Sequence, residues 1–180
     1  MLGLRNISLL AEKENTLKKL VTFAPGNNAD AVRDAIFAAG GGQIGNYSEC
    51  SFNTEGTGTF KPGSAANPQI GQRGKRHKEQ EVKIEVIFPA WLESRLVAAM
   101  KAAHIYEEVA YDFFPLSNKY QGFGSGVIGE WPAPLDEKKF LARIKRVFGV
   151  PVVRHTAYLN KAVKKVAICG GAGSFLISKA

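Results

Sequence analysis

The sequence is poor in the residues from which metal centres, disulfide frameworks and nucleophilic dyads are built. It has two cysteines and three histidines among 180 residues. Cys50 and Cys169 are far apart and lack a neighbouring histidine that could activate a thiolate, so we expect two reduced thiols in a cytoplasmic protein. His77, His104 and His155 are isolated and show no metal-ligand spacing. The sequence therefore predicts no catalytic residue, metal ligand or cofactor within this chain.

Long apolar segments are also missing. No run of 18 apolar residues occurs, which excludes a membrane-spanning helix. The first five residues lack the basic start and the apolar core of a signal peptide. We therefore expect no membrane partner.

The composition is that of a folded protein, with 45% hydrophobic and 22% charged residues. Its net charge of +8 raises the question of a nucleic-acid partner. The basic residues, however, are scattered, with one loop cluster at residues 73–78 and one helical group at residues 138–146. Because no continuous basic stripe with interleaved aromatic residues exists, the pattern does not favour nucleic-acid binding. A contact through the basic loop 73–78 stays as an alternative.

Hydrophobic periodicity predicts four strands and two helices between residues 17 and 116. The expected strands cover residues 17–24, 44–52, 81–88 and 107–114. The expected helices cover residues 31–39, which the glycines 40–42 end, and 92–103, which follow Pro89. A βαββαβ order of this kind predicts a ferredoxin-like α+β domain, with the helices on one face of an antiparallel sheet.

The stretch from Asn53 to Gly74 is dominated by glycine, threonine, proline, serine and asparagine. We expect most of it to leave the sheet, with residues 57–60 able to add a short ribbon. Its glycine-rich backbone and its basic end, up to Lys78, make it the expected contact for a small anionic ligand. A packed loop or a loop between subunits is an equally good interpretation.

The flanking residues predict only part of a second, α/β domain. Residues 5–10 alternate as a strand, and residues 120–134 are typical of a linker or irregular loop. Beyond them, Asp136 caps a helix that Gly149 ends, strands are expected at 152–156 and 164–169, and a last helix begins at Phe175. We therefore divide the chain into residues 1–16, 17–118 and 119–180, and expect exposed apolar faces in the last part to cause self-association.

Two glycine motifs occur within residues 119–180. Residues 124–129 match GxGxxG, but Trp131 and Pro132 follow where a dinucleotide site requires a helix. We interpret this motif as a glycine-rich turn between elements.

The second motif lies between the expected strand 164–169 and the last helix. Backbone N–H groups of Gly170, Gly171, Gly173 and Ser174 could hold an anion at the start of that helix. The alternative is that these glycines only let the strand and the helix pack closely. The turn lacks the lysine of a phosphate-binding P-loop.

Several sequence blocks resemble the inserted PII/CutA-like domain of the Nif-three-like proteins, which are known as GTP cyclohydrolase I type 2 homologues. The blocks are Leu20–Pro25, Gly45–Phe52, Gly56–Gly63 and Asn67-Pro68. The flanks are similar to the main domain of the same family around this insert, at Gly129-Glu130, Leu135, Phe140 and Val166–Ser174. The resemblance covers nearly the whole chain.

The resemblance implies a toroidal homohexamer, with the insert over the openings of a central cavity. It also implies two divalent metal ions in the full-length parent, held by an early His-His stretch and a late His-plus-Glu stretch. Neither stretch occurs in this sequence, so no metal ligand is carried over to any position. We therefore expect a fragment of a dinuclear metal-binding protein.

Three functional hypotheses follow. The preferred one is a regulatory or oligomerisation module that self-associates, as a trimer to hexamer, through sheet edges. The second is a metal-dependent hydrolase of a nucleotide or another phosphorylated small molecule, with its ligands supplied by the full-length protein. The third is nucleic-acid binding through the basic loop.

Overall fold

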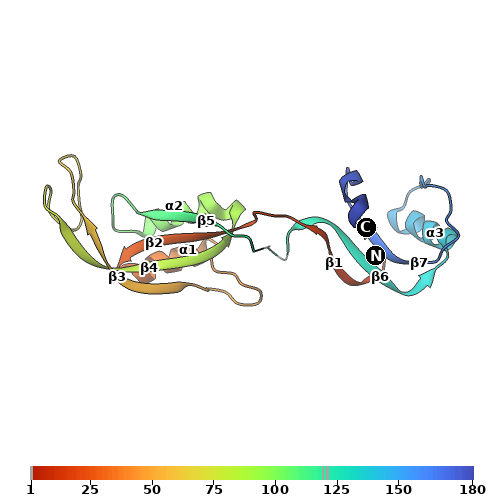
Figure 1. Cartoon of the computed structure of the whole chain (residues 1–180), viewed down its shortest axis with the longest axis horizontal. Helices are drawn as coiled ribbons and strands as arrows, with labels where there is room; N and C mark the ends of the chain where they lie inside the picture. Colours follow the sequence, from red (N-terminus) through yellow and green to blue (C-terminus); the bar gives the residue numbers. More distant parts are fainter. Residues whose placement is uncertain (1, 119, 121) are drawn as a thin grey trace. The chain divides into compact units, whose positions relative to one another are not determined.

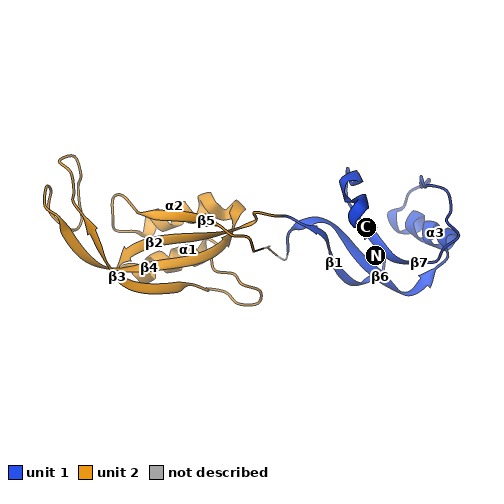
Figure 2. Ribbon diagram, in the orientation of Figure 1, with its two compact units in different colours: residues 1–13, 121–180 blue, residues 14–120 orange. Residues whose placement is uncertain are grey.

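The computed structural model describes residues 2–118, 120 and 122–180. The chain divides into two compact units. One unit is a continuous stretch, residues 14–120, and the other combines residues 1–13 with residues 121–180 (Figure 2). The boundaries drawn from the sequence lie after residues 16 and 118. The continuous unit is inserted between the two segments of the other unit.

Four antiparallel strands form the sheet of the continuous unit (Figure 1). Across the sheet they follow the order β3 (Phe52–Phe60), β4 (His77–Pro89), β2 (Leu17–Pro25) and β5 (Tyr111–Pro115). Helix α1 (Ala29–Ala38) follows β2, and a single 3₁₀ turn, η1 (Ala90–Leu92), leads from β4 into α2 (Glu93–Ala103). This βαββαβ order, with the first and third strands adjacent, confirms the predicted ferredoxin-like α+β fold.

The core of the continuous unit lies between the two helices and one face of the sheet. Alternate residues of the two central strands point into it, because side chains of a strand alternate between its faces. The core residues with no exposed surface are Leu20, Ala24, Val32, Ile36, Ile84, Phe88, Leu96 and Met100. Two long helical stripes and two central strands therefore account for this hydrophobic cluster.

The opposite face of the sheet carries charged residues beside apolar ones such as Val21 and Phe23. Lys83 Nζ lies 2.8 Å from Glu85 Oε1, and Lys19 Nζ lies 3.9 Å from Glu85 Oε2. The hydrogen bond from Lys83, together with the positive charges of Lys19 and Lys83, lowers the pKa of Glu85 and outweighs the opposing effect of its burial. This face is therefore partly exposed to solvent, as the alternation of charged and apolar residues in β4 predicts.

Asn28 joins the start of α1 to the end of α2. Its side chain does not cap α1. Instead, Asn28 Nδ2 donates to the carbonyl oxygen of Ala103 over 3.1 Å, and Asn28 Oδ1 accepts from the N–H of Ile105 over 3.1 Å. The residue thereby sets where the chain leaves α2.

The other unit has a three-stranded antiparallel sheet in the order β1-β6-β7. Its elements are β1 (Arg5–Glu12), β6 (Gly124–Leu135), α3 (Glu137–Phe148), β7 (Val163–Ile168) and the short 3₁₀ helix η2 (Ser174–Lys179). Trp131 is buried in this unit, and the guanidinium of Arg143 lies 5.2 Å from the centre of its ring. Both Trp131 Nε1 and an Arg143 nitrogen donate to the carbonyl oxygen of Leu2.

Both ends of α3 are as predicted. The Asp136 carboxylate accepts from the N–H groups of Lys138 (3.0 Å) and Lys139 (3.3 Å), which would otherwise lack partners at a helix start. Gly149 ends the helix with a φ of 64°, a left-handed conformation that glycine adopts without a steric penalty. The strand predicted at residues 164–169 is also confirmed, as β7.

The strand predicted at residues 44–52 is wrong. Residues 44–47 form a turn closed by reciprocal backbone hydrogen bonds between Ile44 and Tyr47, and Glu49 has a left-handed φ of 59°. The edge strand β3 begins only at Phe52 and runs through the glycine-rich segment that the sequence assigns mainly to a loop. The predicted ribbon at residues 57–60 is confirmed as part of it.

The interpretation of residues 124–129 as a glycine-rich turn, within a linker, is also wrong. These residues begin β6, the central strand of its sheet. A side chain at Gly124 would lie 2.3 Å from the carbonyl oxygen of Ala11, and one at Gly129 would lie 3.1 Å from Leu4 Cβ. Gly124 and Gly129 are thus explained by the close approach of residues 4–12, not by a turn.

Three further expectations fail locally. Residues 152–156 form no strand. The last helix is a six-residue 3₁₀ segment, η2, in place of an α-helix. The fourth predicted strand begins at Tyr111 and not at residue 107.

Within the part of the chain that the structure describes, no helix combines the length and the apolarity needed to cross a bilayer.

Replacing Phe88 by alanine should lower the free energy of unfolding of the 180-residue chain by about 3 to 5 kcal/mol, because its fully buried ring leaves a cavity. Phe52→Ala is the matched control, since the Phe52 side chain is 66% exposed, and should cost under about 1 kcal/mol. Urea unfolding monitored by circular dichroism measures both. Equal costs for the two variants would contradict the assigned core.

Candidate functional site

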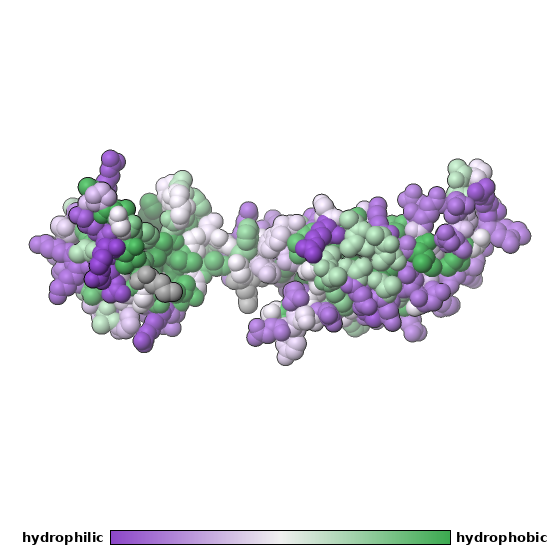
Figure 3. Space-filling model, turned by 180° about the vertical axis from the view of Figure 1, so that it is seen from behind, coloured by the Kyte–Doolittle hydropathy of each residue, from purple (hydrophilic) through white to green (hydrophobic). Residues whose placement is uncertain are grey.

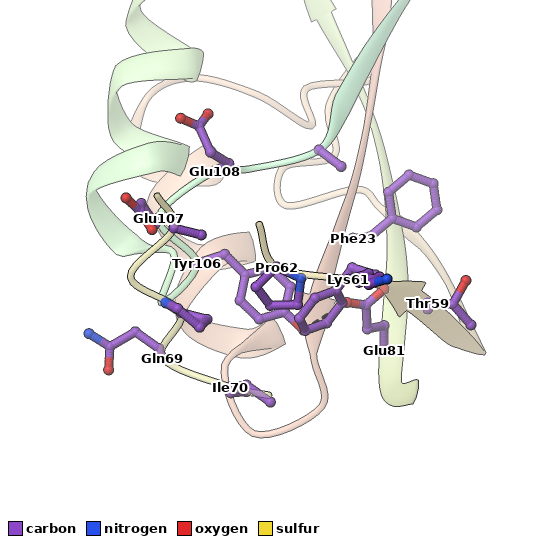
Figure 4. Close-up of a pocket in the computed structure, with 15 residues that line it drawn as sticks. Phe23, Thr59, Lys61, Pro62, Gln69, Ile70, Glu81, Tyr106, Glu107 and Glu108 are labelled. Carbon is purple, nitrogen blue, oxygen red and sulfur yellow. Dashed lines mark hydrogen bonds between the residues drawn. The ribbon is translucent and has the colours of Figure 1, made fainter. Parts of the chain in front are cut away.

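A cavity of about 370 Å³ opens on the continuous unit. It lies where residues 61–70, in the loop between β3 and β4, meet residues 106–110, which lead from α2 into β5 (Figure 4). Phe23 of β2, Gly58 and Phe60 of β3, and Glu81 of β4 complete the wall. Three strands and two loops thus contribute to one site.

Aromatic rings form much of the wall. Phe60 and Tyr106 meet edge to face with their ring centres 5.6 Å apart, and Phe60 also stands 5.3 Å from the ring of His77. The edge-to-face contact of Phe60 with Tyr106 adds to the stabilisation that burial provides. Phe23 and Ile70 extend the apolar lining.

The polar centre of the cavity is a hydrogen bond between Tyr106 and Glu81. The Tyr106 hydroxyl donates to Glu81 Oε1 over 2.8 Å, and the ring points from the segment after α2 toward the carboxylate (Figure 4). A side chain at Gly58 would lie 2.0 Å from Glu81 Oε2, so in this arrangement the carboxylate occupies the space that the glycine leaves open. Burial, the hydrogen bond to Glu81 and the charges of Glu81 and Glu79 all raise the pKa of Tyr106.

The position of Tyr106 is set by His104, which is 8% exposed. The N–H of Tyr106 donates to His104 Nδ1 over 3.0 Å, so this nitrogen is an acceptor and the proton lies on Nε2. His104 Nε2 then donates to the carbonyl oxygen of Phe23 over 2.9 Å. His104 therefore has a structural role and links the backbone of Tyr106 to β2.

Hydrogen bonds hold the loop between β3 and β4, one of them to the opposite wall of the cavity and two within the loop. The N–H of Asn67 donates to Glu107 Oε2 over 2.8 Å, and the N–H of Gly74 donates to the carbonyl oxygen of Pro62 over 2.8 Å. The side chain of Arg73 also donates to the carbonyl oxygen of Ala66. These contacts shape the loop that forms one wall of the cavity.

The charges of the cavity differ from those expected for an anionic ligand of this loop. Three carboxylates line it, from Glu81, Glu107 and Glu108, against one ammonium group, from Lys61. The basic cluster at residues 73–78 is not part of the lining. Charge complementarity at this cavity therefore favours a neutral or cationic ligand.

Sequence reasoning missed Tyr106 and Glu81. Tyr106 fell just before the fourth predicted strand, and Glu81 looked like one of several charges on the wet face of β4. The pair is separated by 25 residues, so no local pattern joins them. The available signal was Gly58, since a glycine in a strand marks close approach of another group.

The glycine turn at residues 170–174 is exposed at Gly170, Gly171 and Ser174. Gly171 has a left-handed φ of 77°, and a side chain at Gly173 would lie 3.0 Å from Cys169 Cβ. The close contact between Gly173 and Cys169 supports the interpretation that this glycine lets the turn pack closely. An anion contact at Gly170, Gly171, Gly173 and Ser174 stays a hypothesis.

The remaining histidines and cysteines are dispersed. His77 Nε2 lies 2.8 Å from Glu79 Oε2, and His155 Nδ1 contacts the carbonyl oxygen of Thr156. Cys50 and Cys169 are both unpaired with another cysteine. Over residues 2–118, 120 and 122–180, no three histidine, cysteine, aspartate or glutamate side chains gather as a possible metal site.

Comparison with known proteins gives the family. The profile of Duf34/NIF3 (NGG1p interacting factor 3) matches residues 1–180. This chain belongs to the Duf34/NIF3 family. The GTP cyclohydrolase 1 type 2 homolog of Halalkalibacterium halodurans is 43% identical over 174 residues, which is 96% of this chain and 47% of the relative. The homolog of the same name from Bacillus subtilis is 39% identical and covers 91% of this chain and 44% of its own length.

Among solved structures, a Bacillus cereus protein related to NIF3 superposes on this Duf34/NIF3 chain with a TM-score of 0.79 and 41% identity. The match covers 99% of this chain and 47% of the Bacillus cereus chain. The sequence therefore spans about half the length of the curated and solved relatives it matches. The resemblance to Nif-three-like proteins stated from the sequence is confirmed.

The raised pKa of Tyr106 predicts a change of stability in alkali. The folded protein holds the phenolic proton more tightly than the unfolded chain, in which tyrosine titrates near pH 10. Its contribution to stability is thus complete below about pH 10 and declines as the pH rises above that value. Tyr106→Phe should flatten this decline, as urea unfolding between about pH 9 and about pH 11 would measure.

Tyr47→Phe is the matched control, because Tyr47 is 75% exposed in the same unit. It should leave the pH dependence as it is in the parent chain. A Tyr106→Phe variant whose stability declines as steeply as that of the Tyr47→Phe variant would contradict the hydrogen bond to Glu81.

Proposed function

We propose that residues 14–120 serve a Duf34/NIF3 protein as an association and regulatory module. The observation that carries the proposal is the edge strand β3. It is nine residues long, pairs with β4 on one side, is mostly exposed, and contains neither lysine nor proline. Edge strands with these properties readily pair with another chain, because their outer backbone groups lack partners.

Exposed apolar side chains support association at the same sheet. Phe52 on β3 is 66% exposed, and Phe114 on the other edge strand, β5, is 51% exposed. Exposed rings of this size at sheet edges are typical of protein interfaces. Assembly as a trimer to hexamer would bury them.

The unit that contains β6 and α3 has an apolar surface of its own. Figure 3 shows hydrophobic residues gathered on it, and its exposed large apolar side chains include Ile7, Phe148, Val152, Leu159, Phe175 and Ile177. The relatives are about twice as long as this chain. We assign this surface to contact with other parts of a full-length protein, in which two divalent metal ions would be held by residues outside this sequence.

A second candidate function is hydrolysis of a nucleotide or another phosphorylated small molecule. It is favoured by the names of the curated relatives, which are called GTP cyclohydrolase 1 type 2 homologs. The described residues lack a cluster of possible metal ligands, so this activity would depend on the full-length protein.

Nucleic-acid binding through the basic loop has weaker support. The Arg73 side chain donates to the carbonyl oxygen of Ala66, and His77 contacts Glu79, so both side chains already have partners within the chain.

The 180-residue chain should form concentration-dependent assemblies of trimer size or larger. Phe52→Lys should shift them toward the monomer, because it removes an exposed ring and adds a charge to the edge strand. Sedimentation velocity of the parent chain and the variant measures the shift.

Tyr47→Lys is the matched control, an exposed aromatic of the same unit that lies outside the sheet. It should assemble like the parent chain. A parent chain that stays monomeric at all concentrations, or two lysine variants that dissociate equally, would contradict association through β3.

A further inference from the structure

The cavity beside Tyr106 has the size and the apolar lining of a small-molecule site. Its volume of about 370 Å³ falls within the range typical of ligand pockets. Phe23, Phe60, Ile70 and Tyr106 offer ring faces, ring edges and an aliphatic side chain. These groups suit a ligand with an aromatic or branched apolar part.

The polar groups of the cavity are acidic. Glu81, Glu107 and Glu108 line it, and Glu107 also accepts from the backbone of Asn67. Lys61 carries the one positive charge among the described lining residues and, like Glu107 and Glu108, is exposed to solvent, so the carboxylates outnumber the ammonium group by three to one. An organic cation would therefore find both carboxylates and aromatic rings here.

Glu81 is held ready to accept a hydrogen bond. The Tyr106 hydroxyl donates to Glu81 Oε1, and Glu81 Oε2 lies in the space left open because Gly58 has no side chain. No described residue donates a hydrogen bond to Glu81 Oε2. An ammonium N–H donates a charge-assisted hydrogen bond to a carboxylate oxygen, which is stronger than a bond from a neutral donor.

From these observations we propose that the cavity binds a small organic amine, protonated at neutral pH, whose apolar part lies against Phe60 and Tyr106 and whose ammonium group donates to Glu81. The inference rests on the regulatory part of the proposed function and names the class of its ligand. Because the loop between β3 and β4 forms one wall, an occupied cavity would also order the end of the edge strand β3.

The test uses the 180-residue chain and three matched probes: phenethylamine, 2-phenylethanol and phenylacetate, which are cationic, neutral and anionic. Titrations are followed by NMR, through the methyl groups of Ile70 and the amide of Tyr106. Phenethylamine should produce saturable shifts and bind about tenfold or more tightly than 2-phenylethanol. Phenylacetate should produce none.

Glu81→Gln should weaken phenethylamine binding about tenfold or more, because it removes the charge of the acceptor. Glu108→Gln, at an exposed lining position, should weaken it less and provides a second variant if Glu81→Gln does not fold. Glu55→Gln is the control, since Glu55 is an exposed carboxylate of β3 outside the lining, and should leave binding unchanged.

Three results would overturn the inference: no saturable shifts with phenethylamine, equal binding of the alcohol or the carboxylate, or equal weakening by Glu55→Gln. Sedimentation of the same samples separates it from the proposed association. Assemblies without amine binding would refute only the ligand class, and amine binding by a chain that stays monomeric would refute only association.

Discussion

The pairing of β2 with β4 is the interaction on which the rest of the continuous unit depends. It joins the two strands along the whole of β2, from Leu17 opposite Pro89 to Pro25 opposite Glu81. This register places Leu20 and Val86 side by side in the core, and it leaves Lys19, Lys83 and Glu85 on the open face. A slip by one residue would exchange the two faces and bury the charges.

The same register explains where the cavity lies. β2 ends at Pro25, while β4 continues for four residues beyond Glu81, toward the N-terminal end, and pairs there with β3 alone. β5 pairs with β2 only as far as Thr22, so the sheet has three strands up to Glu81 and becomes a two-stranded ribbon beyond it. This ribbon carries Phe60 and His77 past the end of β2. Tyr106, held by His104, fills part of the space that this change leaves. The position of the cavity therefore follows from β4 extending beyond the end of β2.

The elements that the sequence predicts well are those with local causes. The alternation of β4, the helical stripes of α1 and α2, and the caps at Asp136 and Gly149 depend on residues near one another in the chain. The strands it misses, β3 and β6, contain glycines whose reason is a distant partner: Glu81 for Gly58, and Ala11 for Gly124. Local reasoning interprets such glycines as turns. The cavity was missed for the same reason, because its parts meet only after β3, β4 and the segment after α2 have folded together.

Under the proposal that residues 14–120 associate through their sheet edges and that the metal ligands belong to other parts of a full-length protein, the 180-residue chain should assemble without holding metal. Native mass spectrometry of the purified 180-residue chain, after incubation with zinc and removal of the excess, tests this claim most directly. We predict assemblies of trimer mass or larger with no bound metal. A chain that retains two metal ions per copy would contradict the account and favour an enzyme that is complete in this sequence.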